Sequence, residues 1–291
     1  MVNGPEAGEA IVDWYGRAAR DLPWRRPDVD AWAVLVSEVM LQQTPVGRVE
    51  PVWREWMTRW PTPAALAEVS PGDVIRAWGK LGYPRRALRL REAAVAIVER
   101  HGGTVPDDVA ALEALPGVGT YTARAVACFG YGHPQPVVDT NVRRVVARLL
   151  HGRAEAGTAR AADLADVVAL TPPDRARAAR FSVAAMELGA LVCVAGTPRC
   201  GACPVRDSCA WVLAGSPPHD GPSRRVQKFA GTDRQVRGRL LDVLRAAPAP
   251  VEPAALDAAW DDAVQRSRCL HSLLVDGLVE QTPEGRFTLP H

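Results

Sequence analysis

The sequence predicts an all-α fold made of short helices, and three observations support this prediction. Apolar residues recur at helical spacing from residue 6 to about residue 191. The period-two alternation typical of half-buried strands is scarce, and the turn signals between the periodic segments are short. We expect helices over residues 9–20, 31–43, 46–60, 73–78, 85–100, 141–150 and 175–192.

Length and composition exclude several classes of protein. A chain of 291 residues is long enough for two domains, or for one large domain with an appendage. A net charge of +2 excludes a basic protein that coats DNA. No apolar run could span a bilayer, and the N-terminus lacks a basic segment followed by an apolar one. We therefore expect a cytoplasmic monomer without a membrane partner.

The chain divides at a segment rich in glycine, proline and serine over residues 215–223. We expect a helical region over residues 1–213, a linker over 214–230 and a separate C-terminal module over 231–291.

A glycine-rich turn occurs at Leu115-Pro-Gly-Val-Gly119, between the end of one helix and the start of the next. Gly117 and Gly119 permit a crowded turn, and the N–H groups at the following helix N-terminus suit a DNA phosphate. The alternative is a plain turn between two core helices.

Four of the six cysteines lie close together, with six, two and five residues between successive members: Cys193, Cys200, Cys203 and Cys209. Their thiolates could hold zinc or a cubane iron–sulfur cluster, and the spacing alone leaves both open. Cys128 and Cys269 stand alone and are expected to be ordinary buried thiols.

Several motifs together resemble one family. The glycine turn followed by Tyr121-Thr-Ala123 resembles the helix-hairpin-helix of the endonuclease III superfamily of DNA glycosylases. Ser37-Glu-Val-Met-Leu-Gln-Gln-Thr44 is similar to the signature of MutY-type adenine DNA glycosylases. Further matching segments run over residues 22–25, 137–144 and 186–189, so the resemblance covers about residues 6 to 230.

The resemblance implies a helix-hairpin-helix DNA glycosylase fold with a [4Fe–4S] cluster on the four-cysteine loop. It also implies an enzyme of base excision repair that acts on double-stranded DNA. Such an enzyme flips and excises adenine mispaired with 8-oxoguanine or guanine, and it hydrolyses the N-glycosidic bond without cutting the strand.

That reaction requires two carboxyl groups of opposite protonation. A carboxylic acid protonates the leaving adenine, and an ionised carboxylate stabilises the positive sugar. Glu38 lies in an apolar run that should raise its pKa, so we assign it as the general acid. Asp139 matches the catalytic aspartate of the superfamily, and Tyr121 and Asn141 resemble residues that hydrogen-bond near it. The alternatives are a solvated Glu38, a core Tyr121, and an Asp139 that only caps a helix.

The resemblance also implies the residues that contact the substrate. The residues expected to line the adenine pocket are Arg20, Leu22, Trp24, Arg25, Leu41 and Glu187. Gln43 and Tyr83 resemble wedge residues that fill the gap and probe the opposite base. Tryptophan and leucine are more usually core residues. The chain departs from the family at Lys80, Pro84 and Thr140, which affects the details of the wedge but not the reaction.

Three other functions compete with this interpretation. A strand-cutting relative carries a catalytic lysine where Tyr121 stands, and the only lysines here are Lys80 and Lys228. A thymine glycosylase tolerates tyrosine there, but the Glu38 signature argues against it. A non-enzymatic iron–sulfur regulator would leave the paired carboxylates unexplained.

Arginines follow the loop that carries Tyr83, at positions 85, 86, 89 and 91. They form either a solvated face or a phosphate contact. In the C-terminal module we expect helices over 234–245, 253–260 and 261–276, then a hairpin around residues 282–285. This order resembles a winged helix, which would present Gln265, Arg266 and Arg268 to DNA or a protein partner. The alternative is a module that only braces the helical region.

Overall fold

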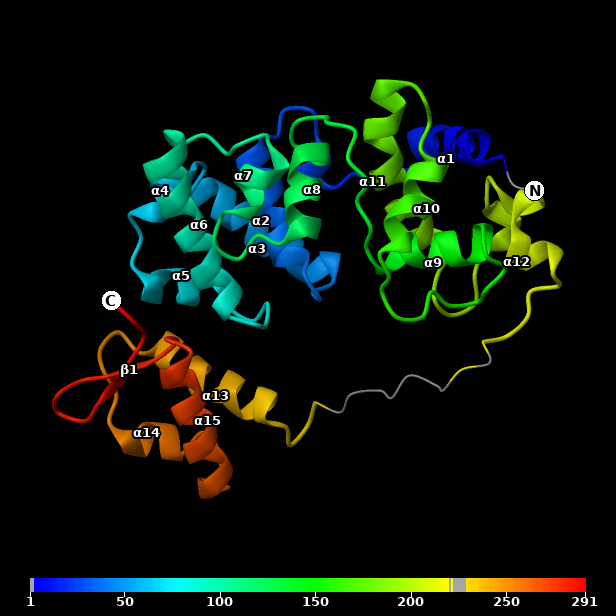
Figure 1. Ribbon diagram of the computed structural model, residues 1–291. Helices are drawn as coiled ribbons and strands as arrows, with labels where there is room; N and C mark the ends of the chain where they lie inside the picture. Colours follow the sequence, from blue (N-terminus) through cyan, green and yellow to red (C-terminus); the bar gives the residue numbers. More distant parts are fainter. Residues whose placement is uncertain (1–2, 220, 222–228) are drawn as a thin grey trace. The chain divides into compact units, whose positions relative to one another are not determined.

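The computed structural model describes residues 3–219, 221 and 229–291, and the regular secondary structure of the described part is almost entirely helical (Figure 1). The first helices are α1 (Gly4–Ala18), α2 (Ala31–Leu41), α3 (Val46–Arg59), α4 (Pro63–Ala67), α5 (Pro71–Trp78), α6 (Arg85–His101) and α7 (Val109–Glu113). They are followed by α8 (Thr120–Phe129), α9 (Thr140–Leu149), α10 (Ala162–Leu170), α11 (Arg175–Leu191) and α12 (Ala210–Leu213). Short 3₁₀ turns lie at Pro23–Arg25, Cys200–Ala202 and Arg206–Ser208.

The prediction of an all-α fold is confirmed, and the seven expected helices are present within a few residues of their expected bounds. Sequence analysis missed α4, α10 and α12, of which α12 has only four residues. Helix α4 has only five residues, too few to show a period. Helix α10 lacks a side-chain cap at Ala161, so it carries no start signal. No helix among the described residues is long and apolar enough to cross a membrane.

The chain forms two compact units. The first unit comprises Met1–Glu38, Pro106–Ala114 and Val118–Pro222, and the second comprises Val39–Val105, Leu115–Gly117 and Ser223–His291. The sequence-based domain boundaries therefore stay a prediction, because each unit combines segments that are distant in the chain.

Helices α1, α9, α10, α11 and α12 of the first unit share one hydrophobic core (Figure 1). Ile11 on α1 and Leu188 on α11 are fully buried there. Helices α9 and α11 approach so closely that a Cβ at Gly189 would lie 2.7 Å from the Cβ of Asn141. Only glycine fits at position 189, and this close packing fixes the start of α9.

In the second unit, three tryptophans pack together between α3 and α5. Trp56 belongs to α3, Trp60 directly follows α3, and Trp78 is the last residue of α5. The Trp56 ring meets Trp60 and Trp78 edge-on, with centroid distances of 4.8 and 5.6 Å. Both Trp56 and Trp78 are fully buried.

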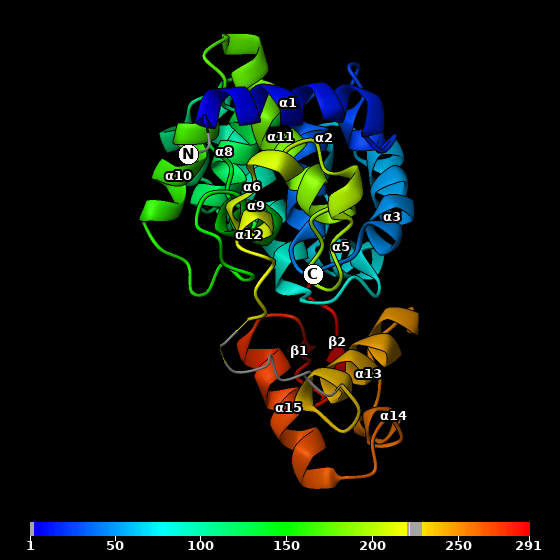
Figure 2. The same cartoon turned by 90° about the vertical axis from the view of Figure 1, so that its right-hand side faces the viewer.

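The C-terminal module belongs to the second unit and contains α13 (Asp233–Ala246), α14 (Pro253–Asp257), α15 (Ala263–Val275), β1 (Glu280–Gln281) and β2 (Phe287–Thr288) (Figure 2). The two strands pair antiparallel, and Gly277 ends α15 with a φ of +67°. Three helices and a hairpin therefore occur in the expected order. Ile75 of α5 shares a hydrophobic core with Val236, Leu240 and Leu273 of the module.

The expected contact residues on α15 are engaged within the module. Gln265 donates to Asp233 at 2.9 Å, and Arg268 pairs with the same carboxylate at 2.8 Å. Arg266 pairs with Asp257 at 2.7 Å. These contacts hold α15 against α13 and α14 within the module, and the role of the three side chains toward DNA or a partner stays a prediction.

Of the predicted linker, residues 214–219, 221 and 229–230 are described. Residues 220 and 222–228, which include Lys228, lie outside the described part of the chain.

Candidate active site

Glu38 lies near the end of α2, in the first unit, and is 7% exposed. Its neighbours along the helix are apolar, as the sequence indicated. Burial raises the pKa of Glu38 to about 7, although a hydrogen bond with Tyr121 and the charge of Arg25 oppose the shift. The carboxyl group is therefore substantially protonated near neutral pH, as a general acid requires.

Tyr121 lies in the first turn of α8 and hydrogen-bonds to Glu38. Burial and the two nearby carboxyl groups raise the pKa of its hydroxyl well above 10. The hydroxyl therefore stays neutral and can donate to Glu38 without adding charge to the site.

Asp139 is the N-cap of α9, and its side chain accepts from the backbone N–H of Val142 at 2.7 Å. The other carboxylate oxygen accepts from Asn141 Nδ2 at 2.8 Å. Burial raises the pKa of Asp139, but these hydrogen bonds and the charge of Arg144 favour the ionised form. The capping role is thus present, and it holds the carboxylate in one orientation.

Arg144 connects this aspartate to the cysteine loop, which sequence analysis did not anticipate. Its Nη2 donates to Asn141 Oδ1 at 2.8 Å and to the Gly189 carbonyl at 2.7 Å. Its Nε donates to the Cys193 carbonyl at 2.7 Å. Asp139, Asn141 and Arg144 therefore form a continuous chain of hydrogen bonds that ends at the first cysteine.

Glu187 on α11 is fully buried and contacts two arginines. Arg20 donates two side-chain hydrogen bonds to its carboxylate, each 2.7 Å long. Arg25 Nη1 lies 2.9 Å from the same carboxylate. Burial alone would raise the pKa of Glu187, but Arg20 and Arg25 lower it to about 2. Besides Glu187, four expected pocket residues belong to the first unit: Arg20, Leu22, Trp24 and Arg25. Leu22 and Trp24 are buried.

The other expected contact residues, Leu41, Gln43 and Tyr83, belong to the second unit. Gln43 and Tyr83 both adopt positive φ, +55° and +48°. This conformation is uncommon for residues other than glycine and persists only where the surroundings impose it. Tyr83 is also 44% exposed, which is unusual for a large aromatic side chain.

Arg86 on α6 imposes these two loop conformations. Its terminal nitrogens donate to oxygens of Val39, Met40, Gln42, Gly82 and Thr44 at 2.7–3.1 Å. The Val39 and Met40 carbonyls belong to the last turn of α2, where backbone carbonyls have no N–H partner within the helix. Arg86 thereby joins the segment before Gln43 to the segment before Tyr83.

The remaining arginines of that cluster also have partners within the protein. Arg85 pairs with Asp276 at 3.2 Å, Arg89 pairs with Glu92 at 2.6 Å, and Arg91 donates to the Val69 carbonyl. Arg86 and Arg91 thus bond to distant segments of the chain, whereas the side chains of Arg85 and Arg89 are exposed, so a solvated face and a phosphate contact both stay predictions for these two.

The glycine turn has the expected geometry. Gly117 adopts a φ of +74°, and a Cβ there would lie 2.6 Å from the Cβ of Arg89. Gly119 is the N-cap of α8 and supplies no side-chain acceptor for the first N–H groups. Those N–H groups suit an anionic ligand.

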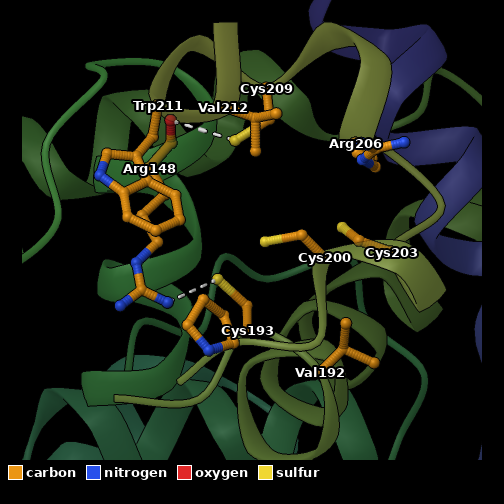
Figure 3. A pocket seen from close by; sticks show the side chains of 10 residues that line it. Arg148, Val192, Cys193, Cys200, Cys203, Arg206, Cys209, Trp211 and Val212 are labelled. Atoms are coloured by element: carbon orange, nitrogen blue, oxygen red, sulfur yellow. Dashed lines mark hydrogen bonds between the residues drawn. The ribbon is translucent and has the colours of Figure 1, made fainter. Parts of the chain in front are cut away.

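The four cysteines line one pocket together with Arg148, Arg206 and Trp211 (Figure 3). Figure 3 shows their side chains arranged around a shared space. Arg148 lies 3.4 Å from Cys193 Sγ and stacks over the Trp211 ring at 4.9 Å. No group of metal-binding side chains in the described residues is tight enough for a single ion. Cys128 and Cys269 are buried, as expected.

Comparisons with known proteins give a consistent result. Residues 36–168 match the model of the HhH-GPD superfamily base excision DNA repair protein family. The chain is 61% identical over 293 residues to an adenine DNA glycosylase of Mycobacterium tuberculosis (strain CDC 1551 / Oshkosh), covering 99% of this chain and 96% of that protein. It is 60% identical to an adenine DNA glycosylase of Mycolicibacterium smegmatis, covering 96% and 94%. A solved thermostable thymine-DNA glycosylase is 26% identical with a TM-score of 0.64, covering 71% of this chain and 95% of its own.

Proposed function

Since the chain belongs to the adenine DNA glycosylase family, we propose that it removes adenine paired with 8-oxoguanine or guanine in double-stranded DNA. The observation that carries this proposal is the pair of carboxyl groups near Tyr121, the buried Glu38 and the half-buried Asp139. Glu38 has a pKa of about 7, while the Asp139 carboxylate accepts two hydrogen bonds that favour its ionised form.

The first role in the reaction belongs to Glu38. Adenine leaves poorly as an anion, so protonation of the base, most usefully at N7, weakens the N-glycosidic bond. A Glu38 with a pKa of about 7 is about half protonated near pH 7 and can donate this proton, and Tyr121 orients its carboxyl group.

The second role belongs to Asp139. As the base departs, positive charge develops on the sugar, and an ionised carboxylate stabilises it or bonds to it before water completes hydrolysis. The N-cap bond and Asn141 hold Asp139 in one orientation, so little reorganisation is needed during the reaction.

Glu187 with Arg20 and Arg25 forms the proposed wall of the adenine pocket. The base must leave the duplex to reach Glu38, and hydrogen-bonding groups then read its edge. Arg25 contributes both to this wall and to the electrostatics of Glu38. Leu22, Trp24 and Leu41 would supply apolar surface, and Gln43 and Tyr83 would fill the gap in the duplex.

The proposed reaction ends with an abasic site and an uncut strand. Strand cleavage needs an amine that attacks the sugar, and Tyr121 carries none. Lys80 is 82% exposed, pairs with Asp242 and belongs to the second unit.

A base-release assay on three duplexes tests the proposal. We expect adenine release from A opposite 8-oxoguanine and from A opposite G, with no thymine release from G opposite T. The product strand should remain intact until alkali is added. Thymine release without adenine release would contradict the proposal.

We also propose that Cys193, Cys200, Cys203 and Cys209 hold a [4Fe–4S] cluster. They line one pocket together with Arg148 and Arg206, and their spacing is similar to that of the four-cysteine cluster loop of the superfamily. When bound, the cluster supplies a structural anchor for this loop. Iron analysis of the purified protein should give four iron atoms per chain, whereas stoichiometric zinc would contradict this assignment.

A further inference from the structure

The ring of Tyr83 contacts two arginines that come from different parts of the second unit. The guanidinium carbon of Arg86 on α6 lies 5.6 Å from the ring centroid. That of Arg234 on α13 lies 5.5 Å away. A guanidinium within about 6 Å of an aromatic centroid is attracted to the ring. The side chain of Tyr83 is thus held by the helical region and by the C-terminal module.

The module also binds the chain on both sides of Tyr83. Lys80, three residues before it, pairs with Asp242 of α13 at 3.7 Å. Arg85, two residues after it, pairs with Asp276 at 3.2 Å, and Asp276 in turn pairs with Arg237 at 2.6 Å. Each of these exposed pairs is weak alone. Together with Arg234 they fix the Tyr83 loop, residues 79–85, to the module at three positions.

Packing beneath these contacts fixes the position of Arg234. It lies in the first turn of α13, two residues before Val236, which is fully buried. Val236 shares its core with Ile75 of α5, and Arg245 of the same helix donates to the Ile75 carbonyl at 3.2 Å. Helix α13 is therefore held against α5 by Val236 near its start and by Arg245 near its end.

From this geometry we propose that Arg234 of the C-terminal module is a positioning residue, which sets the orientation of Tyr83 toward the base opposite adenine. The inference rests on the proposed function, in which Tyr83 probes that base. Tyr83 has a positive φ and an exposed ring, so its orientation depends on neighbouring side chains. Arg234 supplies one of the two cations that set this orientation.

Point variants test this better than deletion, because removing residues 231–291 would expose Ile75 and the rest of the shared core. The test variant is Arg234→Ala. The matched control is Arg239→Ala on the same helix, because Arg239 stacks over Trp260 at 5.4 Å and so loses the same kind of contact away from Tyr83. Both variants remove one positive charge, and Arg234→Lys restores the charge at the tested position.

The readout is the ratio of single-turnover adenine release from A opposite 8-oxoguanine to that from A opposite G, at enzyme concentrations below saturation. We expect Arg234→Ala to lower this ratio about 2- to 5-fold, the value of one exposed cation–π contact. Arg239→Ala should keep the wild-type ratio, and Arg234→Lys should recover part of it.

A double variant identifies the route of the effect. In a Tyr83→Ala background, Arg234→Ala should change the ratio no further, because the two side chains act as one unit. The inference is overturned if Arg234→Ala keeps the wild-type ratio, if Arg239→Ala lowers it equally, or if the effect persists without Tyr83. Absence of adenine release by the wild-type protein on either duplex would overturn the proposed function, and this inference with it.

Discussion

Two buried glutamates of the first unit have opposite protonation. Glu38 on α2 has a pKa raised to about 7, whereas Glu187 on α11 has a pKa lowered to about 2. Both side chains are withdrawn from water, with 7% and 0% exposure. Their partners differ, since Glu38 meets a neutral hydroxyl and Glu187 meets two guanidinium groups. Burial by itself raises the pKa of a carboxyl group, and the charge of its hydrogen-bonding partners then decides whether the group keeps its proton near neutral pH.

Arg25 links the two sites. Its charge lowers the pKa of Glu38, and it lies 2.9 Å from the Glu187 carboxylate. Glu187 therefore offsets a charge that would otherwise favour loss of the Glu38 proton. The Glu187 ion pair and the pKa of Glu38, the proposed general acid, are therefore linked through Arg25.

The largest expected effect comes from Glu38→Gln. Glutamine keeps the size of the side chain but cannot donate the proton, so adenine release should fall about 10²- to 10⁴-fold. Single-turnover kinetics at saturating enzyme would measure the loss, and a binding titration should show that affinity for the duplex is retained. Release close to the wild-type rate would remove Glu38 from the mechanism.

Glu187→Gln should act mainly on stability. It leaves Arg20 and Arg25 without their carboxylate, and loss of one partner of a buried ion pair costs about 3–5 kcal/mol. We expect a loss in the free energy of unfolding at the lower end of this range, because the Arg20 side chain is 35% exposed. Urea denaturation would measure the change. Glu50→Gln is the matched control, because it removes an exposed pair with Arg54 and should cost less than about 1 kcal/mol.

Glu187→Gln should also shift the pH profile of adenine release. An uncompensated Arg25 lowers the pKa of Glu38, so the alkaline limb of adenine release should shift to lower pH than in the wild type. An unchanged limb would show that the two glutamates are electrostatically independent, which contradicts the link through Arg25.

The smallest effect is expected from Asn141→Ala. Release requires a protonated Glu38 and an ionised Asp139, so the wild-type rate should fall as pH rises through about 7 and again at acidic pH. Asn141 donates to Asp139 and lowers its pKa, so its loss should raise that pKa further. The acidic limb should therefore move to higher pH while the alkaline limb stays in place. Movement of both limbs would indicate a general disturbance of the site.

Some features of this protein followed from the sequence alone. Helical periodicity predicted the all-α fold, and the apolar run around Glu38 predicted its desolvation. The position of Asp139 before a helix predicted its capping bond. These properties are local, since they depend on residues within one or two helical turns. The catalytic, pocket and wedge roles of the site residues all stay predictions.

The tertiary structure decided which arginines join the segments of the chain. Arg86 binds carbonyls that lie 44 to 47 residues away in sequence, and Arg144 binds the Cys193 carbonyl 49 residues away. In the sequence such residues belong to a row of cations, which is typical of a solvated face. A guanidinium group has five donors on a long side chain, so its partners depend on which carbonyls folding brings within reach. For this reason the desolvation of Glu38 and the capping bond of Asp139 could be predicted locally. The partners that set the protonation of Glu38 and Glu187, and the arginines that contact Tyr83 and Asn141, came together only when distant segments met.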